Sequence, residues 1–195
     1  MEMPNQAVRD ARAGWIAAAL AALTTAGPAA VTVEGLARTM TVTKGSFYWH
    51  FGSRAELMAA ALAQWAQDQT QALIDEAERA GSAADKLAVL FHRVAEQNSP
   101  GYRESALYQA ATDEPDGQVA RAVRRVTDAR IDYVTKLLVA QQVLPRLARE
   151  RAQLALALVI GSRVLYTAFP ALAPGPAGRA RSTALALAMM TSLGG

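Results

Sequence analysis

The ten residues Val42–Phe51, VTKGSFYWHF, combine hydroxyl, basic and aromatic side chains in a chain in which only 6% of residues are aromatic. Hydroxyls, basic side chains and the amino ends of helices are the groups with which proteins hold nucleic-acid phosphates. A lysine also suits guanine edges, and hydroxyls can bond to either kind of base pair. The polar members of the stretch are Thr43, Lys44, Ser46, Tyr48 and His50.

Helical spacing divides the four large rings of this stretch between two roles. Phe47 and Phe51 are four residues apart, so in a helix they share one face, and we expect that face to be core. Tyr48 and Trp49 then point elsewhere. Spacing alone leaves equal weight to the alternative that all four rings pack internally.

The pattern of residues 32–51 predicts two short helices joined by a tight turn. Thr32 is a suitable N-cap for a helix through Met40, and Thr43 caps the next helix, through His50. A helix-turn-helix unit of this kind presents the amino end of its second helix to the DNA major groove. Ser53, with Glu56 three residues later, forms a capping box that opens a longer helix.

Breakers rich in glycine and proline divide the rest of the chain into segments with helical spacing of apolar residues, so we expect an all-α protein. We find no persuasive strand and no internal repeat. Nine helices are predicted, at residues 8–25, 32–40, 43–50, 54–79, 85–97, 102–112, 118–142, 145–169 and 178–192.

Composition limits the possible functions. The chain has no cysteine and two histidines, which excludes disulfides and disfavours a metal site, and its net charge of +3 permits a nucleic-acid partner. No phosphate-binding glycine loop or nucleophile signature is present, so we expect no enzymatic activity and no cofactor. Gly27 and Pro28 interrupt the long uncharged N-terminal run, so we expect no membrane span. The lack of cysteine permits a cytoplasmic location, which is the one we expect. The alternative is an exported helical protein with this run as a cleaved signal, which Glu2 and Asp10 disfavour.

The segment TVEGLARTMTVTKGSFYWHFGSRAEL, from Thr32 to Leu57, resembles the DNA-binding region of TetR-family transcriptional regulators. The resemblance implies a helix-turn-helix head, placed at residues 1–53, and a helical domain at 54–195 that binds a small-molecule effector and forms a homodimer. It further implies a regulator, most simply a repressor, that binds a palindromic operator in double-stranded DNA and leaves it when the effector binds.

The resemblance assigns DNA contacts residue by residue. It places phosphate contacts, caps or close backbone approach at Thr32, Thr43, Lys44, Gly45, Tyr48, His50 and Arg54, and Ser46 joins Lys44 as a candidate base reader. The sequence departs from the family at the turn, where Met40 and Thr41 replace a small residue and a glycine. A β-branched residue with positive φ is costly, so either the turn differs or Thr41 stores strain.

A ligand pocket between helices needs large apolar side chains and a few polar groups. The candidates are Trp65, Phe91, Tyr108, Tyr133, Arg163 and Tyr166, and ordinary core packing is the alternative for each ring. Arg163 lies on a strongly apolar helix and could meet an acidic inducer, an internal carboxylate or the surface. A helical small-molecule-binding protein or enzyme with a vestigial head is the other remaining alternative.

Apolar stripes on the last two predicted helices exceed what a monomer needs, and the resemblance places the dimer interface there. These stripes could instead face the protomer's own core. They comprise Leu147, Leu154, Leu158, Leu165, Leu185 and Met189.

Overall fold

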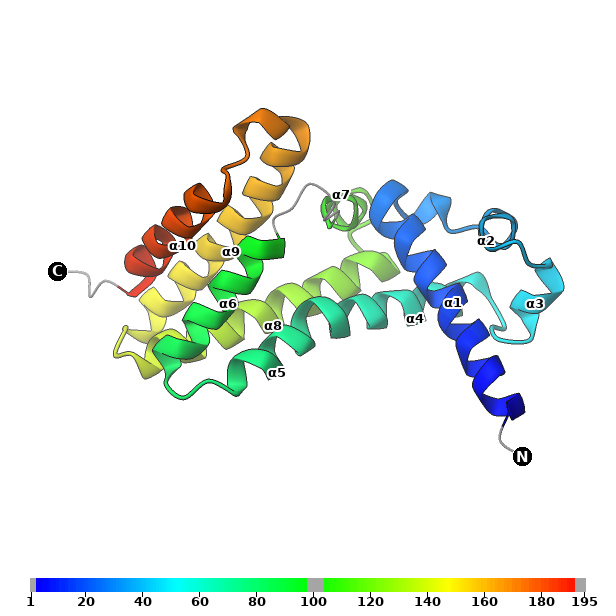
Figure 1. Cartoon of the computed structure of the whole chain (residues 1–195), viewed down its shortest axis with the longest axis horizontal. Coiled ribbons are helices and arrows are strands. Elements are labelled where there is room, and N and C mark those ends of the chain that lie inside the picture. The colour runs from blue at the N-terminus through cyan, green and yellow to red at the C-terminus, as the bar shows by residue number, and fades with distance from the viewer. Residues whose placement is uncertain (1–2, 98–103, 192–195) are drawn as a thin grey trace. The chain divides into compact units, whose positions relative to one another are not determined.

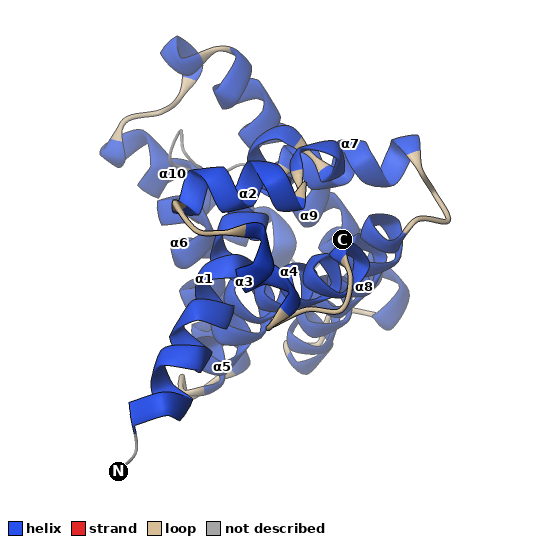
Figure 2. Cartoon of the chain, turned by 90° about the vertical axis from the view of Figure 1, so that its right-hand side faces the viewer, coloured by secondary structure: helices blue, strands red, loops and turns tan. Residues whose placement is uncertain are grey.

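The computed structural model describes residues 3–97 and 104–191, and all regular structure in these two ranges is helical (Figures 1 and 2). The α-helices are α1 (Met3–Ala26), α2 (Val33–Met40), α3 (Lys44–Tyr48), α4 (Arg54–Ala66), α5 (Ala72–Glu78), α6 (Ala83–Gln97), α7 (Ser105–Asp113), α8 (Gln118–Ala140), α9 (Pro145–Ala168) and α10 (Pro176–Thr191). A π-helical turn, Gln67–Gln71, joins α4 to α5 without a break, so these ranges hold nine separate helices.

The predicted all-α fold is therefore confirmed, and most helix boundaries fall within a few residues of the prediction. The main differences are that α1 begins at Met3 rather than near Val8 and that α3 ends at Tyr48, before His50. The predicted start at Tyr102 and the predicted end at Ser192 lie outside the described residues. No described helix is long and apolar enough to cross a bilayer.

The chain forms two compact units. Unit 1 consists of residues 1–67 and 103–124, and unit 2 of residues 68–102 and 125–195. Within the described ranges, the chain passes between them inside the π-turn and inside α8. These units do not divide at residue 53, because the start of the long helix and α7 both pack against α1 in unit 1. The functional division into 1–53 and 54–195 stays a prediction.

Aromatic packing forms the core of unit 1. Trp15 on α1 meets Phe47 edge to face, with ring centroids 5.4 Å apart, and Phe47 stacks on Phe51 at 5.7 Å. Both phenylalanines are at most 2% exposed, whereas Tyr48 is 68% and Trp49 87% exposed. The predicted division of the four rings is thus confirmed.

Side-chain caps begin the helices that surround this core. Thr32 accepts a hydrogen bond from the N–H of Gly35, Thr43 from Ser46, and the Ser53 hydroxyl from Glu56. The Glu56 carboxylate accepts the N–H of Gly52, one residue before the cap. The three predicted N-caps therefore start α2, α3 and α4.

In unit 2, α6 and α9 both pack against α10, and the 3₁₀ turn Pro170–Leu172 leads from α9 towards α10 (Figure 1). The core residues of this cluster are Leu87, Leu137, Leu138, Val143, Ala148 and Met190. Leu147, a residue of the predicted apolar stripe, packs against this cluster, so that part of the stripe faces the protomer's own core.

Thr41 ends α2 in the left-handed conformation, with φ 57° and ψ 41°. Its N–H donates to the carbonyl of Arg38, and the N–H of Val42 donates to that of Ala37, which is the Schellman pattern of a helix end. The turn thus has the form that glycine favours, and a β-branched residue occupies it. Thr41 stores strain there, which settles the choice that the sequence left open.

We expect Thr41→Gly to stabilise the protein by about 0.5–1 kcal/mol in urea unfolding. Removing a left-handed β-branched residue relieves about 1–2 kcal/mol, and the added entropy of glycine in the unfolded chain offsets part of that gain. Thr39→Gly, inside α2, is the matched control and should lose about 0.5–1 kcal/mol. A clear loss of stability in Thr41→Gly would show that the turn is not left-handed.

Candidate nucleic-acid interface

The short helix α3 buries Phe47 and leaves most of the polar side chains in and beside it exposed. Thr43, Lys44, Gly45 and Tyr48 are exposed, while Ser46 and His50 are half-buried. Thr32, the exposed cap of α2, precedes Glu34, whose side chain reaches α3. The structure therefore gathers most of the predicted DNA-contacting residues on α3 and at the start of α2.

An ion pair joins the two helices of the motif. Lys44 Nζ lies 2.6 Å from Glu34 Oε1, and both side chains are more than half exposed. The hydrogen bond from Lys44 holds the pKa of Glu34 below its usual value. Lys44 is thus paired with Glu34 in the free protein. The sequence contains both residues but does not show that they meet.

Arg54 has a positioning role that sequence reasoning missed. Its Nε donates to the carbonyl of Val31 at 2.6 Å, and its guanidinium also bonds to the carbonyl of Pro28. Pro28 begins the 3₁₀ turn Pro28–Ala30, and Val31 caps the end of this turn, just before α2. Arg54 therefore fixes the start of α4 to the segment that leads into the helix-turn-helix.

Trp49 is the exposed aromatic residue that the predicted contact set omits. It follows the last residue of α3 and exposes more of its side chain than Tyr48 does. The spacing does predict that Trp49 is exposed, because it lies two residues from each of the buried rings Phe47 and Phe51 and residues two apart in a helix do not share a face. Together with Tyr48 it forms an exposed aromatic pair, and exposed apolar patches, unlike single exposed rings, mark interaction sites.

The family comparison decides what this motif is. Residues 16–61, which include α2, α3 and the first part of α4, match the family described as bacterial regulatory proteins, tetR family. This segment of the chain is a TetR-family DNA-binding domain. The resemblance seen in the sequence is therefore confirmed, and with it the assignment of the TetR-family chain to DNA-binding transcription regulators.

Solved structures share the whole fold. A TetR-family transcriptional regulator from Streptomyces coelicolor superposes with a TM-score of 0.76 at 21% identity, covering 98% of this chain and 97% of the other. A TetR-family regulator from Agrobacterium tumefaciens has a TM-score of 0.76 at 19% identity, covering 95% and 100%. SmeT, the repressor of the Stenotrophomonas maltophilia multidrug efflux pump SmeDEF, has a TM-score of 0.62 at 21% identity, covering 92% and 87%. No curated protein matches the sequence significantly.

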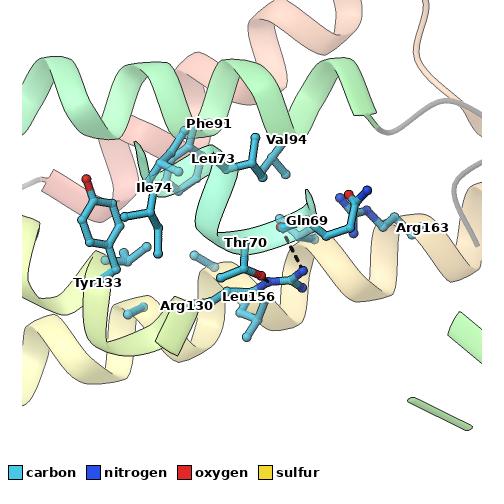
Figure 3. Close-up of a pocket in the computed structure, with 15 residues that line it drawn as sticks. Gln69, Thr70, Leu73, Ile74, Phe91, Val94, Arg130, Tyr133, Leu156 and Arg163 are labelled. Atoms are coloured by element: carbon cyan, nitrogen blue, oxygen red, sulfur yellow. Dashed lines mark hydrogen bonds between the residues drawn. The ribbon is translucent and has the colours of Figure 1, made fainter. Parts of the chain in front are cut away.

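Unit 2 of this TetR-family chain contains a cavity of about 100 Å³ between the π-turn, α5, α6, α8 and α9 (Figure 3). Three of the predicted ligand residues, Phe91, Tyr133 and Arg163, line it. Tyr166 and Phe91 line a second cavity of about 100 Å³ beside α10. Trp65 and Tyr108 belong to unit 1 and line neither cavity; Trp65 Nε1 donates to Glu104 Oε1 at 2.9 Å.

Three polar residues at the first cavity, Gln69, Thr70 and Arg130, were not predicted from the sequence. Arg130 Nε donates to the hydroxyl of Thr70 at 2.9 Å, and its Nη2 donates to the carbonyl of Gln69 at 3.2 Å. The Tyr133 hydroxyl is buried without a hydrogen bond of good geometry, and burial, together with nearby Glu78, raises its pKa. No local pattern signals this site, because it depends on where α8 meets the π-turn.

We expect Arg54→Ala to destabilise unit 1 by about 1–2 kcal/mol, because it removes charged hydrogen bonds to two backbone carbonyls. Urea unfolding followed by circular dichroism measures the change. Arg38→Ala, at an exposed position on α2, is the matched arginine control and should stay within about 0.5 kcal/mol of the parent. Equal, small effects of the two substitutions would show that Arg54 does not hold the start of α2.

Proposed function

We propose that this TetR-family protein is a ligand-responsive repressor that binds a palindromic operator in double-stranded DNA as a homodimer and releases it when a small molecule occupies the cavity of unit 2. The observation that carries the DNA-binding part is the exposure of Tyr48 and Trp49 beside Thr43 and Lys44. A cation on a short helix and two large exposed rings at its end suit a phosphate-rich partner, and packing within the chain does not explain why the rings are exposed.

Each polar side chain of the predicted contact set around α3 has a chemical role in this proposal. Thr43, Tyr48 and His50 bond to phosphates, while Lys44 and Ser46 read base edges. Gly45 supports the same arrangement, because an added Cβ there would meet only Thr43 Oγ1, at 3.7 Å, which is ordinary contact. Packing within the chain therefore does not require glycine at this position, and an approaching DNA backbone gives a reason for it.

Exposed apolar side chains on the last two helices support the homodimer. Large hydrophobic residues on α9 and α10 remain exposed in the single chain, and Gly161 has open space where a Cβ would be. A patch of this kind marks a protein interface, and a two-fold dimer matches a palindromic site. The patch comprises Leu154, Leu158, Val164, Leu165, Leu185 and Met189.

Release requires that the ligand bind one conformation of the dimer better than the other. The helix that begins at Arg54 carries residues of both units and contains the π-turn at their division. Thr70 in that turn bonds to Arg130, which lines the cavity. A ligand that moves Arg130 therefore acts on the helix that continues into the DNA-binding unit. SmeT, similar in fold, is a repressor, and we assign this sign of regulation by analogy.

Fluorescence anisotropy with duplexes from the upstream region of the gene tests DNA binding. We expect tight, sequence-selective binding that weakens about tenfold or more in Lys44→Ala, because a charged hydrogen bond is lost, and a salt slope lower by about one per head. Lys136→Ala, at an exposed position in unit 2, is the matched lysine control and should change nothing. Weak binding that is equal for every duplex and insensitive to Lys44→Ala contradicts the proposal.

Glu34→Gln in the same assay tests whether Glu34 competes with DNA for Lys44 or orients Lys44 towards DNA. The substitution removes a negative charge and the partner that holds Lys44 in the free protein, so affinity for specific and nonspecific duplexes should both rise. If Glu34→Gln instead weakens binding as Lys44→Ala does, the ion pair orients Lys44 towards DNA rather than competing with it.

A further inference from the structure

We propose that the two cavities of unit 2 form one elongated site for an alkyl compound of medium chain length whose polar end accepts hydrogen bonds. The alkyl chain lies in the first cavity and passes between α6 and α9, and the polar end lies in the second cavity beside Arg179. Calling this compound the effector rests on the proposed function, but its binding does not.

The two cavities share one wall. Phe91 and Val94 on α6, and Ala155 and Val159 on α9, line both of them. Figure 3 shows Phe91 and Val94 together at the α6 side of the first cavity. Phe91 is the largest of the four side chains and is only partly buried. A change of its rotamer is therefore the simplest way to connect the two cavities.

The volumes favour a ligand that occupies both cavities. Each has a volume of about 100 Å³. An engineered apolar cavity of about 150 Å³ binds benzene, so neither cavity alone is large enough for six carbon atoms without adjustment of its lining. The two together exceed that size and, in the same proportion, hold a chain of about eight carbon atoms.

The two cavities differ in polarity, which gives the site a direction. The surface that faces the first cavity is almost wholly apolar, although Arg130 and Arg163 are among its lining residues, whereas more of the surface that faces the second cavity is polar. An alkyl chain therefore gains most from burial in the first cavity, and a polar group finds partners in the second. The hydroxyl-bearing residues of the second cavity are Ser162, Tyr166, Ser182 and Thr183.

Arg179 determines which kind of polar end fits the second cavity. It is half-buried, and its one hydrogen bond to a described residue runs from Nη1 to the carbonyl of Pro174, at 3.0 Å. None of the described aspartates and glutamates forms an ion pair with it. A guanidinium donates hydrogen bonds and accepts none, so the polar end of the ligand must accept them. A carboxylate meets this requirement with charge-assisted bonds, and an ammonium group does not.

Calorimetric titration of the purified full-length protein with hexanoate, heptanoate and octanoate tests the length of the site. We expect affinity to rise by about fourfold with each added methylene, because each one leaves water for the first cavity. Octylammonium, which has the same chain and a head that cannot accept, should bind about tenfold or more weakly than octanoate.

Three results on the parent protein overturn the proposal: equal affinity for hexanoate and octanoate, equal affinity for octanoate and octylammonium, or no binding of octanoate at about 10 mM, where even a site of about millimolar Kd is mostly filled. These comparisons do not depend on how any variant folds.

Two variants locate the bound chain. Ala155→Leu fills space between the cavities and should weaken octanoate about tenfold or more, whereas Ala88→Leu, at an exposed position on α6, should not. Arg179→Gln should weaken octanoate about fivefold, and Arg181→Gln, at an exposed position on the same helix, should change nothing. If Ala155→Leu or Arg179→Gln binds octanoate as the parent does, the chain lies elsewhere, such as on the exposed apolar residues of α9 and α10, and the proposal fails.

Anisotropy with operator DNA and octanoate then separates the alkyl site from the proposed function. Octanoate binding without loss of DNA affinity supports the alkyl site and contradicts the release mechanism. Specific DNA binding without octanoate binding supports the regulator and contradicts the alkyl site.

Discussion

Burial of Phe47 and Phe51 against Trp15 is the constraint on which the head of this protein depends. With these rings inside, the same short segment must turn Tyr48 and Trp49 outward, because neighbouring residues of a helix point in different directions. One set of contacts thus holds α3 on α1 and also creates the exposed surface. Stability of the core and presentation of the polar face are two results of one arrangement.

The remaining contacts of the head set the direction of that face. A left-handed Thr41 turns the chain between α2 and α3, and Arg54 holds the turn before α2 through backbone carbonyls. Neither residue needs to touch DNA to matter for binding. The pair of Glu34 and Lys44 balances a positive with a negative charge on the same exposed surface.

The sequence predicted those features that depend on residues close together in the chain. Caps at Thr32, Thr43 and Ser53, the all-helical fold and the division of the four rings follow from hydroxyl positions and helical spacing. It did not predict contacts between residues distant in the chain, such as Arg54 with Pro28 or Arg130 with Thr70, because no local pattern records which helices meet. Trp65 shows the same limit: its type suggested a ligand pocket, and its position in the fold joins it to Glu104 instead.

The central claim is that two copies of this head read a symmetric DNA sequence. Selection of the tightest-binding duplexes from a pool of random sequence tests it most directly, because the selection itself identifies the preferred operator. The account predicts enrichment of one sequence with two inverted half-sites at a fixed spacing. Absence of enrichment, or enrichment of a single asymmetric half-site, would contradict it.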